Sequence, residues 1–476
     1  MAITDIKTKI VCTIGPACQS QKMMEKMLSA GMNIARLNFS HGGYESHGKV
    51  IQNLRTAAAV TGKRLAILAD LPGPKIRIGQ FEREPIELLP NDRFTLTTED
   101  ILGDGRQVSV TFKKLPEVVR PGHLLFINDG MLQLEVQAVS GPHVHCRVLV
   151  GGELLSRKGL NLPGIELGIG AFTETDHAWL EFAAKHGLDA ISQSFVETAD
   201  DVRAVRKAAA ALGYHPFIIA KIERSSALDH VDEILQAADG IMVARGDLGV
   251  EIPIEQIAMV QKRLMQKANR AGKPVITATQ MLLSMTGNRR PTRAESTDVA
   301  NAILDGTDCV MLSEESAMGR YPVEAVTMLS TISAATEPFL TDPSIRTGSN
   351  TTLIKDDMSI RDIICYSVRS AVEHVCPALI IAPTKTGATA RRIARFRLPV
   401  WIVGVSRHRH TCQQLQFSYG VHPHYEKEHP ENWKSFARNL MKQHGIQGEI
   451  VILTERPSSS HPSGNNRMEI LDLTRQ

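Results

Sequence analysis

The 476-residue sequence lacks CxxC pairs, long apolar runs and any strong excess of charge. Its seven cysteines are scattered, so a zinc or dithiol redox site has little support. No apolar run approaches the ~18 residues of a membrane span, and residues 1–9 lack the apolar core of a signal peptide. A net charge of only +3 predicts no general attraction to nucleic acid or membranes. We therefore expect a cytoplasmic protein with neither kind of partner.

Short apolar segments recur along the chain, and helical patterns lie between most of them. Hydrophobic residues make up 43% of the chain, enough for a sizeable buried core. Buried parallel strands appear as such apolar runs, and their alternation with helices predicts a parallel sheet. The segments are 8–15, 32–40, 65–70, 189–196, 217–223, 240–247, 274–279 and 309–314. Eight repeats fit an α/β fold of the (β/α)8 barrel (TIM barrel) type, with an open doubly wound sheet as the alternative.

The remaining sequence predicts two further units. Residues 79–170 interrupt the barrel pattern, and alternation such as that in 131–136 indicates a small inserted β domain, expected to be a β-barrel, that is able to act as a lid. Strands expected at 378–382, 400–405, 449–453 and 468–473, with helices at 387–396 and 433–444, indicate a C-terminal α/β domain. We thus expect barrel segments at 1–78 and 171–343, the lid at 79–170, and the C-terminal domain at 344–476.

Two carboxylates are expected at the ends of neighbouring barrel strands. Lys221 and Glu223 share one face of the fifth strand, because residues two apart point the same way. Asp247 ends the sixth strand in this interpretation. Two carboxylates that lie close together repel unless a cation separates them, and Mg²⁺ prefers carboxylate and substrate oxygens. The pair therefore predicts a magnesium site; the alternative is that each carboxylate pairs with a neighbouring Lys or Arg.

Other strand ends also carry polar side chains. Arg36, Asn38 and Ser40 are spaced by two in the second segment, and an arginine in a barrel mouth suits an anionic ligand. Asp70 ends the third segment, and Arg77 follows shortly after it. Thr279 and Ser313 end the seventh and eighth segments, where a hydroxyl can equally serve as a turn or helix cap.

The chain contains neither of the common nucleotide-binding loops. GxxxxGK[ST] is absent, and no GxGxxG follows a strand. The turn at 244–249 does place backbone N–H groups at an expected helix start, which can bind carboxylate or phosphate. Magnesium, a lysine and an arginine around a small anion suit phosphoryl transfer, which depends on positioning and charge neutralisation.

Several long motifs resemble the pyruvate kinase family. They are Lys221-Ile-Glu223, the segments 242–251 (MVARGDLGVE), 277–282 (TATQML), 33–42 (NIARLNFSHG), 73–77 (GPKIR) and 161–164 (NLPG). The resemblance covers essentially the whole chain. It implies a phosphotransferase of the last step of glycolysis, which converts phosphoenolpyruvate and ADP into pyruvate and ATP. It also implies Mg²⁺ as cofactor, with Mn²⁺ as a substitute, and a homotetramer.

The resemblance also implies individual roles. Arg36 and Lys221 contact the transferring phosphoryl group, and Glu223 and Asp247 hold magnesium. Gly246, Asp247 and Thr279 bind the substrate carboxylate, and Ser313 joins Thr279 in a proton relay. Arg77 and Lys158 bind nucleotide phosphates, and Asp129 belongs to the lid. Asn38, Ser40, Asp70 and position 71 surround a monovalent cation in many members.

The sequence departs from the family pattern at that cation region. Potassium-dependent members have a glutamate where this chain has Lys75, and a threonine where it has Leu71. Leu71 offers no side-chain oxygen, and the Lys75 ammonium carries the same unit charge as potassium. We therefore expect Lys75 to replace the ion, so that K⁺ is not required; the alternative is a solvated loop lysine.

A hydroxyl-rich loop in the C-terminal domain matches the effector loop of the family. It comprises Thr384, Lys385, Thr386, Gly387 and Thr389, with Arg456 in a second loop. The loop resembles that of bacterial members activated by AMP or sugar monophosphates more than that of members activated by fructose 1,6-bisphosphate, and the alternative is a plain turn. A magnesium-dependent barrel lyase acting on a 2-oxo acid, or a non-catalytic sensor of sugar phosphates, are the competing functions. The sensor is disfavoured because Lys221, Glu223 and Asp247 are all present.

Overall fold

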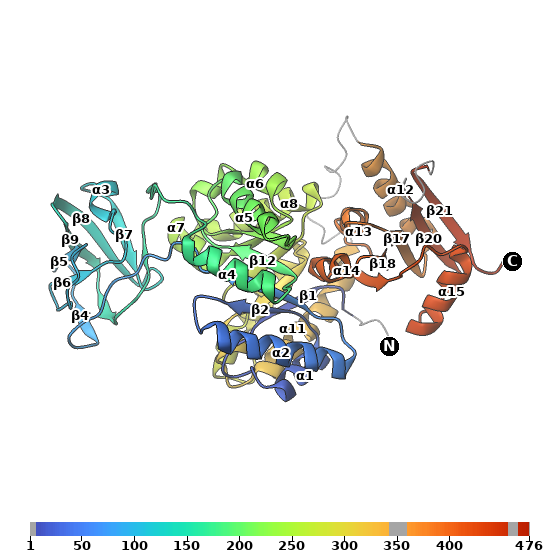
Figure 1. Cartoon of the computed structure of the whole chain (residues 1–476), viewed down its shortest axis with the longest axis horizontal. Coiled ribbons are helices and arrows are strands. Elements are labelled where there is room, and N and C mark those ends of the chain that lie inside the picture. The colour runs from blue at the N-terminus through green and yellow to red at the C-terminus, as the bar shows by residue number, and fades with distance from the viewer. Residues whose placement is uncertain (1–5, 342–358, 456–464, 476) are drawn as a thin grey trace.

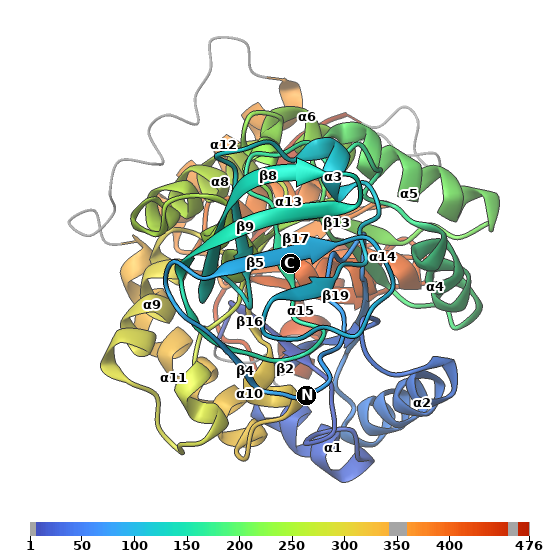
Figure 2. The ribbon, with the colours of Figure 1, turned by 90° about the vertical axis from the view of Figure 1, so that its left-hand side faces the viewer.

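Three units lie in a row along the long axis of the computed structural model (Figure 1). The structure describes residues 6–341, 359–455 and 465–475. The inserted lid occupies one end, the barrel the centre, and the C-terminal unit the other end (Figure 1). Figure 2 views the molecule from the lid end, with the lid strands in front of the barrel. The expected boundary at 343/344 and the expected effector residue Arg456 lie outside the described residues.

Within the described residues, eight parallel strands close the barrel, so the open-sheet alternative is wrong. Their order around the barrel is β1-β16-β15-β14-β13-β12-β3-β2. The strands are β1 (Lys9–Thr13), β2 (Met32–Asn38), β3 (Ala66–Leu71), β12 (Ala190–Gln193), β13 (Phe217–Ile222), β14 (Gly240–Ala244), β15 (Val275–Ala278) and β16 (Cys309–Leu312). Each falls within or within one residue of its expected segment.

Helices follow the barrel strands; most of them cover the outside of the barrel, and the short ones at 245–251 and 314–317 lie at the cleft. They are α1 (Gln21–Ala30), α2 (Tyr44–Thr61), α4 (Glu174–Lys185), α5 (Ala199–Ala211), α6 (Val231–Ala237), α7 (Arg245–Glu251), α8 (Ile257–Ala271), α9 (Arg293–Leu304), α10 (Glu314–Ala317) and α11 (Pro322–Thr336). Local sequence explains several of their starts. At α9, for example, the Thr292 hydroxyl accepts from the Glu295 backbone N–H, and Glu295 accepts from that of Thr292. Such a capping box satisfies donors that a helix start leaves without partners.

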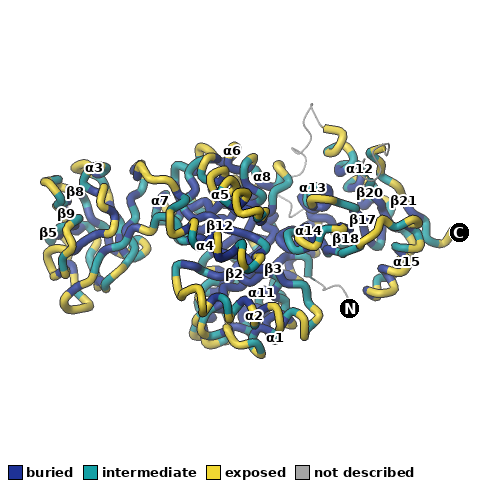
Figure 3. The backbone as a smooth tube through the Cα atoms, in the orientation of Figure 1, coloured by how far each residue is buried: buried dark blue, intermediate teal, exposed yellow. Residues whose placement is uncertain are grey.

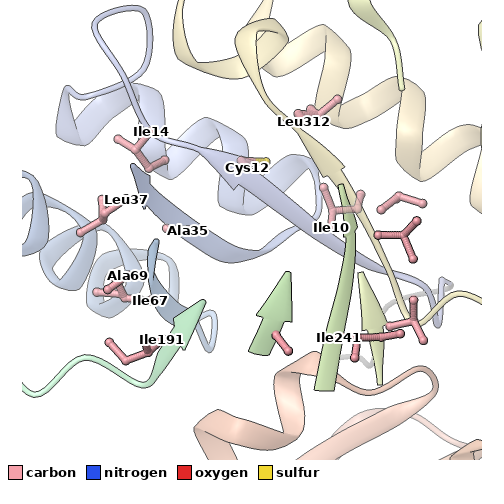
Figure 4. Packing of buried hydrophobic residues seen from close by; sticks show 14 of the residues in the cluster. Ile10, Cys12, Ile14, Ala35, Leu37, Ile67, Ala69, Ile191, Ile241 and Leu312 are labelled. Carbon is pink, nitrogen blue, oxygen red and sulfur yellow. The ribbon is translucent and has the colours of Figure 1, made fainter. Parts of the chain in front are cut away.

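Alternation along each strand divides the barrel core into two clusters. Side chains such as Ile10, Cys12, Ala35 and Leu37 face the helices, and Figure 4 shows this outer packing. Side chains at the intervening positions, such as Ile34, fill the interior. Buried backbone accordingly concentrates in the barrel strands (Figure 3). The same period of two decides which polar side chains reach the barrel mouth.

The lid forms between β3 and β12 and has its own apolar core, which includes Ile78, Phe94 and Leu134. In its described residues a six-stranded sheet has the order β11-β7-β8-β9-β5-β6, and β10 pairs with β4. The elements are β4 (Ile86–Leu88), β5 (Arg93–Thr97), β6 (Gln107–Ser109), α3 (Leu115–Val118), β7 (Leu124–Ile127), β8 (Leu132–Ser140), β9 (His143–Val150), β10 (Gly152–Leu154) and β11 (Leu160–Asn161).

The C-terminal unit is an α/β layer whose described sheet has the order β19-β18-β17-β20-β21. Only the β20–β21 pair is antiparallel. The elements are α12 (Ile360–Val375), β17 (Leu379–Pro383), α13 (Ala388–Ala394), β18 (Trp401–Ser406), α14 (Arg409–Gln414), β19 (Val421–Tyr425), α15 (Trp433–His444), β20 (Ile450–Glu455) and β21 (Arg467–Asp472). The sequence patterns missed β19, α12 and α14.

Candidate active site

The candidate site begins at interior positions near the carboxyl ends of the barrel strands. Ile34, Leu68 and Ile219 fill the barrel interior. Two residues further along the same strands stand Arg36, Asp70 and Lys221. These three polar side chains are therefore carried by the pleat of the strands into the barrel mouth, as the spacing predicted.

Lys221 lies among oxygen atoms from three strands. Its Nζ is 2.8 Å from Glu223 Oε1 and 3.4 Å from Asp70 Oδ1. It also donates to the Ser194 hydroxyl at 2.7 Å. Burial lowers the pKa of Lys221, but Asp70 and Glu223 outweigh burial and hold it above its usual value. Lys221 is therefore a fixed positive charge at neutral pH.

Arg36 forms the second fixed charge of the cluster. Its Nε donates to Asp70 Oδ2 at 3.2 Å, and its Nη1 donates to the Thr13 hydroxyl at 2.9 Å. Asp70 is buried, which alone would raise its pKa; Arg36 and Lys221 instead hold the pKa of Asp70 well below its usual range. One buried carboxylate thus orients both cations.

The two candidate metal ligands lie close enough to repel each other. Burial, followed by the charge of Glu223, raises the pKa of Asp247 to about 6. A divalent cation would relieve that repulsion, so the residues fit a magnesium site. In the described part of the chain, no group of three or more His, Cys, Asp or Glu side chains could hold a metal. Two carboxylates leave the remaining magnesium positions to substrate oxygens and water.

Asp247 does not end β14, and this expectation was wrong. β14 ends at Ala244, and Asp247 lies in the first turn of α7. The sequence Arg-Gly-Asp turns into a helix immediately after the strand, so Asp247 reaches the mouth from a helix start. Glu223 also follows its strand by one residue, and its Oε2 accepts the Phe195 backbone N–H at 2.7 Å.

Gly246 and Thr279 are packed against each other beside Asp247. The Gly246 N–H donates to the Thr279 hydroxyl at 2.9 Å. A Cβ at Gly246 would lie 3.1 Å from Thr279 Cγ2, so a larger residue would push Thr279 aside. Thr279 itself has φ of 65°, a strained conformation that persists where the surroundings impose it and is common in active sites.

A cleft of about 600 Å³ opens above this cluster, between barrel and lid. Its lining brings together the expected residues Lys75, Arg77, Asp129, Lys158, Gly246, Asp247, Thr279 and Ser313. Arg77 Nη1 donates to the Arg157 carbonyl at 2.8 Å, which ties two lid connections together. Ser313 precedes α10, and its backbone N–H donates to Glu315 Oε2 at 2.7 Å. The cleft is therefore polar, with cations on its lid side.

The residues expected around a monovalent cation fall into two groups: Asn38 and Leu71 bond to other protein groups, whereas Lys75 lines the cleft. Asn38 Oδ1 accepts the Ser40 backbone N–H at 3.1 Å, so the side chain of Asn38 holds its own turn. Leu71 faces the helices, away from the barrel interior, and its carbonyl accepts from Ser194. Lys75 lines the cleft and is exposed, although many protein atoms surround it. Partial burial and then the charge of Lys221 lower the pKa of Lys75, whereas the charge of Asp70 raises it.

The effector-loop residues lie far from this cleft, in the C-terminal unit. The Thr384 hydroxyl accepts the Gly387 N–H at 2.9 Å, and Lys385 and Thr386 are exposed. Thr389 is buried in the first turn of α13.

Sequence reasoning missed three hydroxyls that orient the charged cluster. Ser192 donates to Asp70 Oδ1 at 2.6 Å, Ser194 accepts from Lys221, and Thr13 accepts from Arg36. A signal was present: Ser192 and Ser194 are spaced by two at the end of an apolar segment, the same pattern that identified Arg36 and Asn38.

Comparison with known proteins identifies the family. The model described as "Pyruvate kinase, barrel domain" matches residues 6–326, and that described as "Pyruvate kinase, alpha/beta domain" matches residues 362–471. A pyruvate kinase from Thermococcus litoralis is 45% identical over 99% of this chain and 100% of its own length. One from Geobacillus stearothermophilus is 42% identical over 98% of this chain and 80% of its own length.

A solved structure agrees with the sequence relatives. The crystal structure of a pyruvate kinase from Cryptosporidium parvum superimposes with a TM-score of 0.91 at 36% identity, over 98% of this chain and 96% of that one. Family models, sequence relatives and fold converge on the same assignment, and the chain belongs to the pyruvate kinase family.

Proposed function

We propose that the cluster around Lys221 transfers the phosphoryl group in the pyruvate kinase reaction of this chain. The reaction itself, phosphoenolpyruvate plus ADP giving pyruvate plus ATP, follows from the family, which generally uses Mg²⁺. One observation carries the assignment of the site. Lys221 and Arg36 are buried cations held on a common carboxylate, Asp70, at the mouth of the barrel.

Each residue then has a defined task. Charge on a loose phosphoryl transition state spreads over its equatorial oxygens, and Lys221 and Arg36 stabilise that charge. Glu223 and Asp247 hold the metal, which when bound supplies Lewis-acid stabilisation of substrate and phosphoryl oxygens. Gly246, Asp247 and Thr279 bind the substrate carboxylate, and Thr279 with Ser313 delivers the enolate proton. Arg77 and Lys158 hold the nucleotide phosphates.

A coupled assay with phosphoenolpyruvate and ADP tests this function. Pyruvate should appear only when ADP and Mg²⁺ are both present, and Mn²⁺ should substitute for Mg²⁺. The competing barrel lyase would form its product without a nucleotide, so pyruvate formation in the absence of ADP would contradict the proposal. A protein that binds phosphoenolpyruvate but never turns it over would favour the sensor.

We further propose that the chain belongs to a bacterial-type, potassium-independent group within the family. The support is the position of Lys75 at the cleft, where its charge interacts with that of Asp70. An ammonium there would both repel potassium and make it redundant. Leu71 contributes only its carbonyl, because its side chain packs in the outer core.

Regulation is proposed to act through the loop Thr384–Thr389, with AMP or a sugar monophosphate favoured over fructose 1,6-bisphosphate. The exposed Lys385 and Thr386 support this proposal, because they can meet a phosphate from solvent. The buried Thr389 would act on loop shape instead. Arg456, the remaining residue of the proposal, lies outside the described residues.

Assembly, location and domain limits are also proposals. A homotetramer would cover the exposed apolar side chains of Ile360 and Ile363 on α12 and Ile470 on β21. Light scattering after size exclusion would measure the mass of the assembly.

Among the described residues, none of the helices combines the length and apolar character that crossing a membrane requires. A cytoplasmic location is supported by scattered cysteines without a CxxC pair. Separate core clusters support the division into barrel, lid and C-terminal units with the proposed limits 1–78, 79–170, 171–343 and 344–476, except that Ile76 and Ile78 pack in the lid core, just before the proposed limit at 78/79.

A further inference from the structure

A second cavity lies at the opposite end of the barrel from the active-site cleft. Its volume is about 330 Å³, and it separates the barrel from the C-terminal unit. The barrel side is formed by α5, the loop around His215 and the start of β13 at Ile218. Thr386, Arg391 and α14 close the other side. Figure 1 shows α13 and α14 between the barrel and the C-terminal sheet.

Arg391 lines this cavity as a half-buried cation with few partners. Its Nη2 donates to the Thr386 carbonyl at 2.7 Å. Its Nη1 is buried and has no hydrogen-bond partner among the described residues. Its guanidinium lies 5.3 Å from the centre of the Phe217 ring. The surrounding protein lowers the pKa of Arg391, and the charge of Asp239 opposes this effect only in part.

The one carboxylate in the cavity lining is already engaged. Asp239 Oδ2 lies 3.0 Å from Arg206 Nη2 and accepts the Ile218 backbone N–H at 3.0 Å. Asp239 pairs with Arg206 and forms no ion pair with Arg391, although its charge still partly compensates that of Arg391. Two arginines therefore share a single carboxylate among the described lining residues, so the cavity favours an anion.

Other titratable groups around the cavity respond to its positive potential. Burial lowers the pKa of Lys273, and the nearby charges of Arg391, Arg206 and Arg392 lower it further, against the opposing effect of Asp239. His410 lines the cavity, and burial followed by His408 and His215 lowers its pKa. A dianion in the cavity would oppose the effect of these positive charges and favour the protonated form of His410.

We propose that this interdomain cavity binds a small phosphorylated metabolite, whose phosphate is held by Arg391. The cavity is large enough for a phosphate with a small organic body, and the Gln414 side-chain amide, which gives one N–H to the His215 carbonyl, has a second N–H to donate. The site differs from the proposed effector loop, which presents Lys385 to solvent and shares only Thr386 with the cavity.

The cavity also lies at the beginning of the strand that carries Lys221. Ile218 lines the cavity, and Lys221 is three residues further along β13, about 10 Å away. Phe217 of the same strand stacks on Phe417 of the C-terminal unit, with ring centres 5.3 Å apart. A ligand that bridges the two units would restrain the start of β13 and thereby the position of Lys221. This coupling rests on the proposed role of Lys221, whereas binding itself does not.

Calorimetric titration of the full chain with inorganic phosphate tests the site. Arg391→Gln should weaken phosphate binding at this site at least tenfold. His410→Glu places a carboxylate in the lining and should also weaken phosphate binding at least tenfold. It provides a second test if Arg391→Gln fails to fold. Arg203→Gln is the matched control, because Arg203 is exposed on α5 and pairs with Asp200 outside the cavity. Unchanged binding in folded Arg391→Gln and His410→Glu, or no phosphate binding by the wild-type chain, would overturn the proposal.

Rates at subsaturating phosphoenolpyruvate test the coupling. Phosphate should change the wild-type rate through a component that Arg391→Gln removes and Arg203→Gln retains. Competition between phosphate and phosphoenolpyruvate at the active site would persist in all three proteins, so it can be told apart from an effect that acts through the cavity. If Arg391→Gln abolishes binding but leaves the response of the rate intact, the cavity does not act on β13. If pyruvate formation is absent while phosphate binding still depends on Arg391, the cavity site holds and the proposed function fails.

Discussion

Lys221 Nζ lies 2.8 Å from Glu223 Oε1, two residues along the same strand end. The lysine therefore compensates the charge of a candidate metal ligand whenever no metal is present. A cation bound to that carboxylate would compete with the ion pair and leave Lys221 free to face an anionic substrate. The proposed catalytic cation and the proposed metal ligand would thus depend on each other, and substitutions at the two positions separate their effects.

Lys221→Met should spare substrate binding and lower kcat by about a hundredfold or more, because a positive charge on the transferring phosphoryl group is lost. Steady-state kinetics will show this as a fall in kcat at nearly constant KM. Lys267→Met is the control, since Lys267 pairs with Asp232 on the outside of the barrel. Near-normal turnover in a folded Lys221→Met protein would refute the role of Lys221.

Glu223→Ala should abolish metal-dependent turnover while the barrel stays folded, because only Asp247 would remain to hold the cation. Titration of activity with Mg²⁺, alongside circular dichroism, measures both effects. Glu233→Ala provides the comparison, as Glu233 is exposed on α6 beside His230. Full activity of Glu223→Ala at ordinary Mg²⁺ would place the metal elsewhere.

Wild-type activity should be complete without potassium, because Lys75 supplies the charge. Rates in sodium, potassium and tetramethylammonium buffers measure this directly. Lys75→Glu, best combined with Leu71→Thr, should make activity respond to potassium. A wild-type enzyme stimulated tenfold or more by potassium, equivalent to about 1.4 kcal/mol of barrier, would show that Lys75 does not replace the ion.

Thr384→Ala should blunt activation by the physiological effector, because the Thr384 hydroxyl holds the Gly387 N–H and so shapes the loop. Activation curves with glucose 6-phosphate, ribose 5-phosphate, AMP and fructose 1,6-bisphosphate identify the ligand. We expect a monophosphate to be the stronger activator. The idea fails if none of the four acts and Thr384→Ala is silent as well.

Asp189 should make the protein less stable as pH rises from about 4 to 6. Burial raises its pKa from 3.8 to about 6, although the Ile67 backbone N–H donates to it at 2.8 Å. The folded state then holds this proton more tightly than the unfolded chain, and ionisation above pH 6 costs about 3 kcal/mol at most. Asp189→Asn should raise the melting temperature at pH 7.5 more than at pH 4.5. Asp200→Asn is the control, because Asp200 is exposed. Equal shifts of the melting temperature of Asp189→Asn at both pH values would contradict the prediction.

Interior strand positions could be predicted from the sequence, whereas positions after the strands could not. Arg36, Asp70 and Lys221 each lie two positions after an apolar interior residue. Because side chains two apart on a strand point to the same side, these three residues could be placed in the barrel interior from the sequence. Asp247 was misplaced because a strand and a helix start share the same apolar-to-polar transition, and only the chain turn distinguishes them. The orienting hydroxyls of Ser192 and Ser194 were overlooked, although the same period marks them.

The C-terminal unit was predicted less completely for a related reason. β17 and β20 are buried apolar runs and were predicted as strands. β19 contains His422 and His424, so it is not an apolar run and was not predicted. Its pairing with β18 supplies the stability that its own composition does not indicate. The cavity beside Arg391 is formed by residues from both units, so no local pattern could reveal it.

The insertion of the lid between two neighbouring barrel strands constrains the order of folding during synthesis. Ser192 on β12 meets Asp70 on β3 across 122 positions, and β1 cannot pair with β16 until most of the chain exists. The lid core, whose members run from Ile76 to Leu167, is complete much earlier. The lid is therefore the first unit able to finish folding on the ribosome, while β3 waits with an open edge. Open strand edges favour aggregation, so slow translation beyond residue 167 should make nascent chains depend most on chaperones.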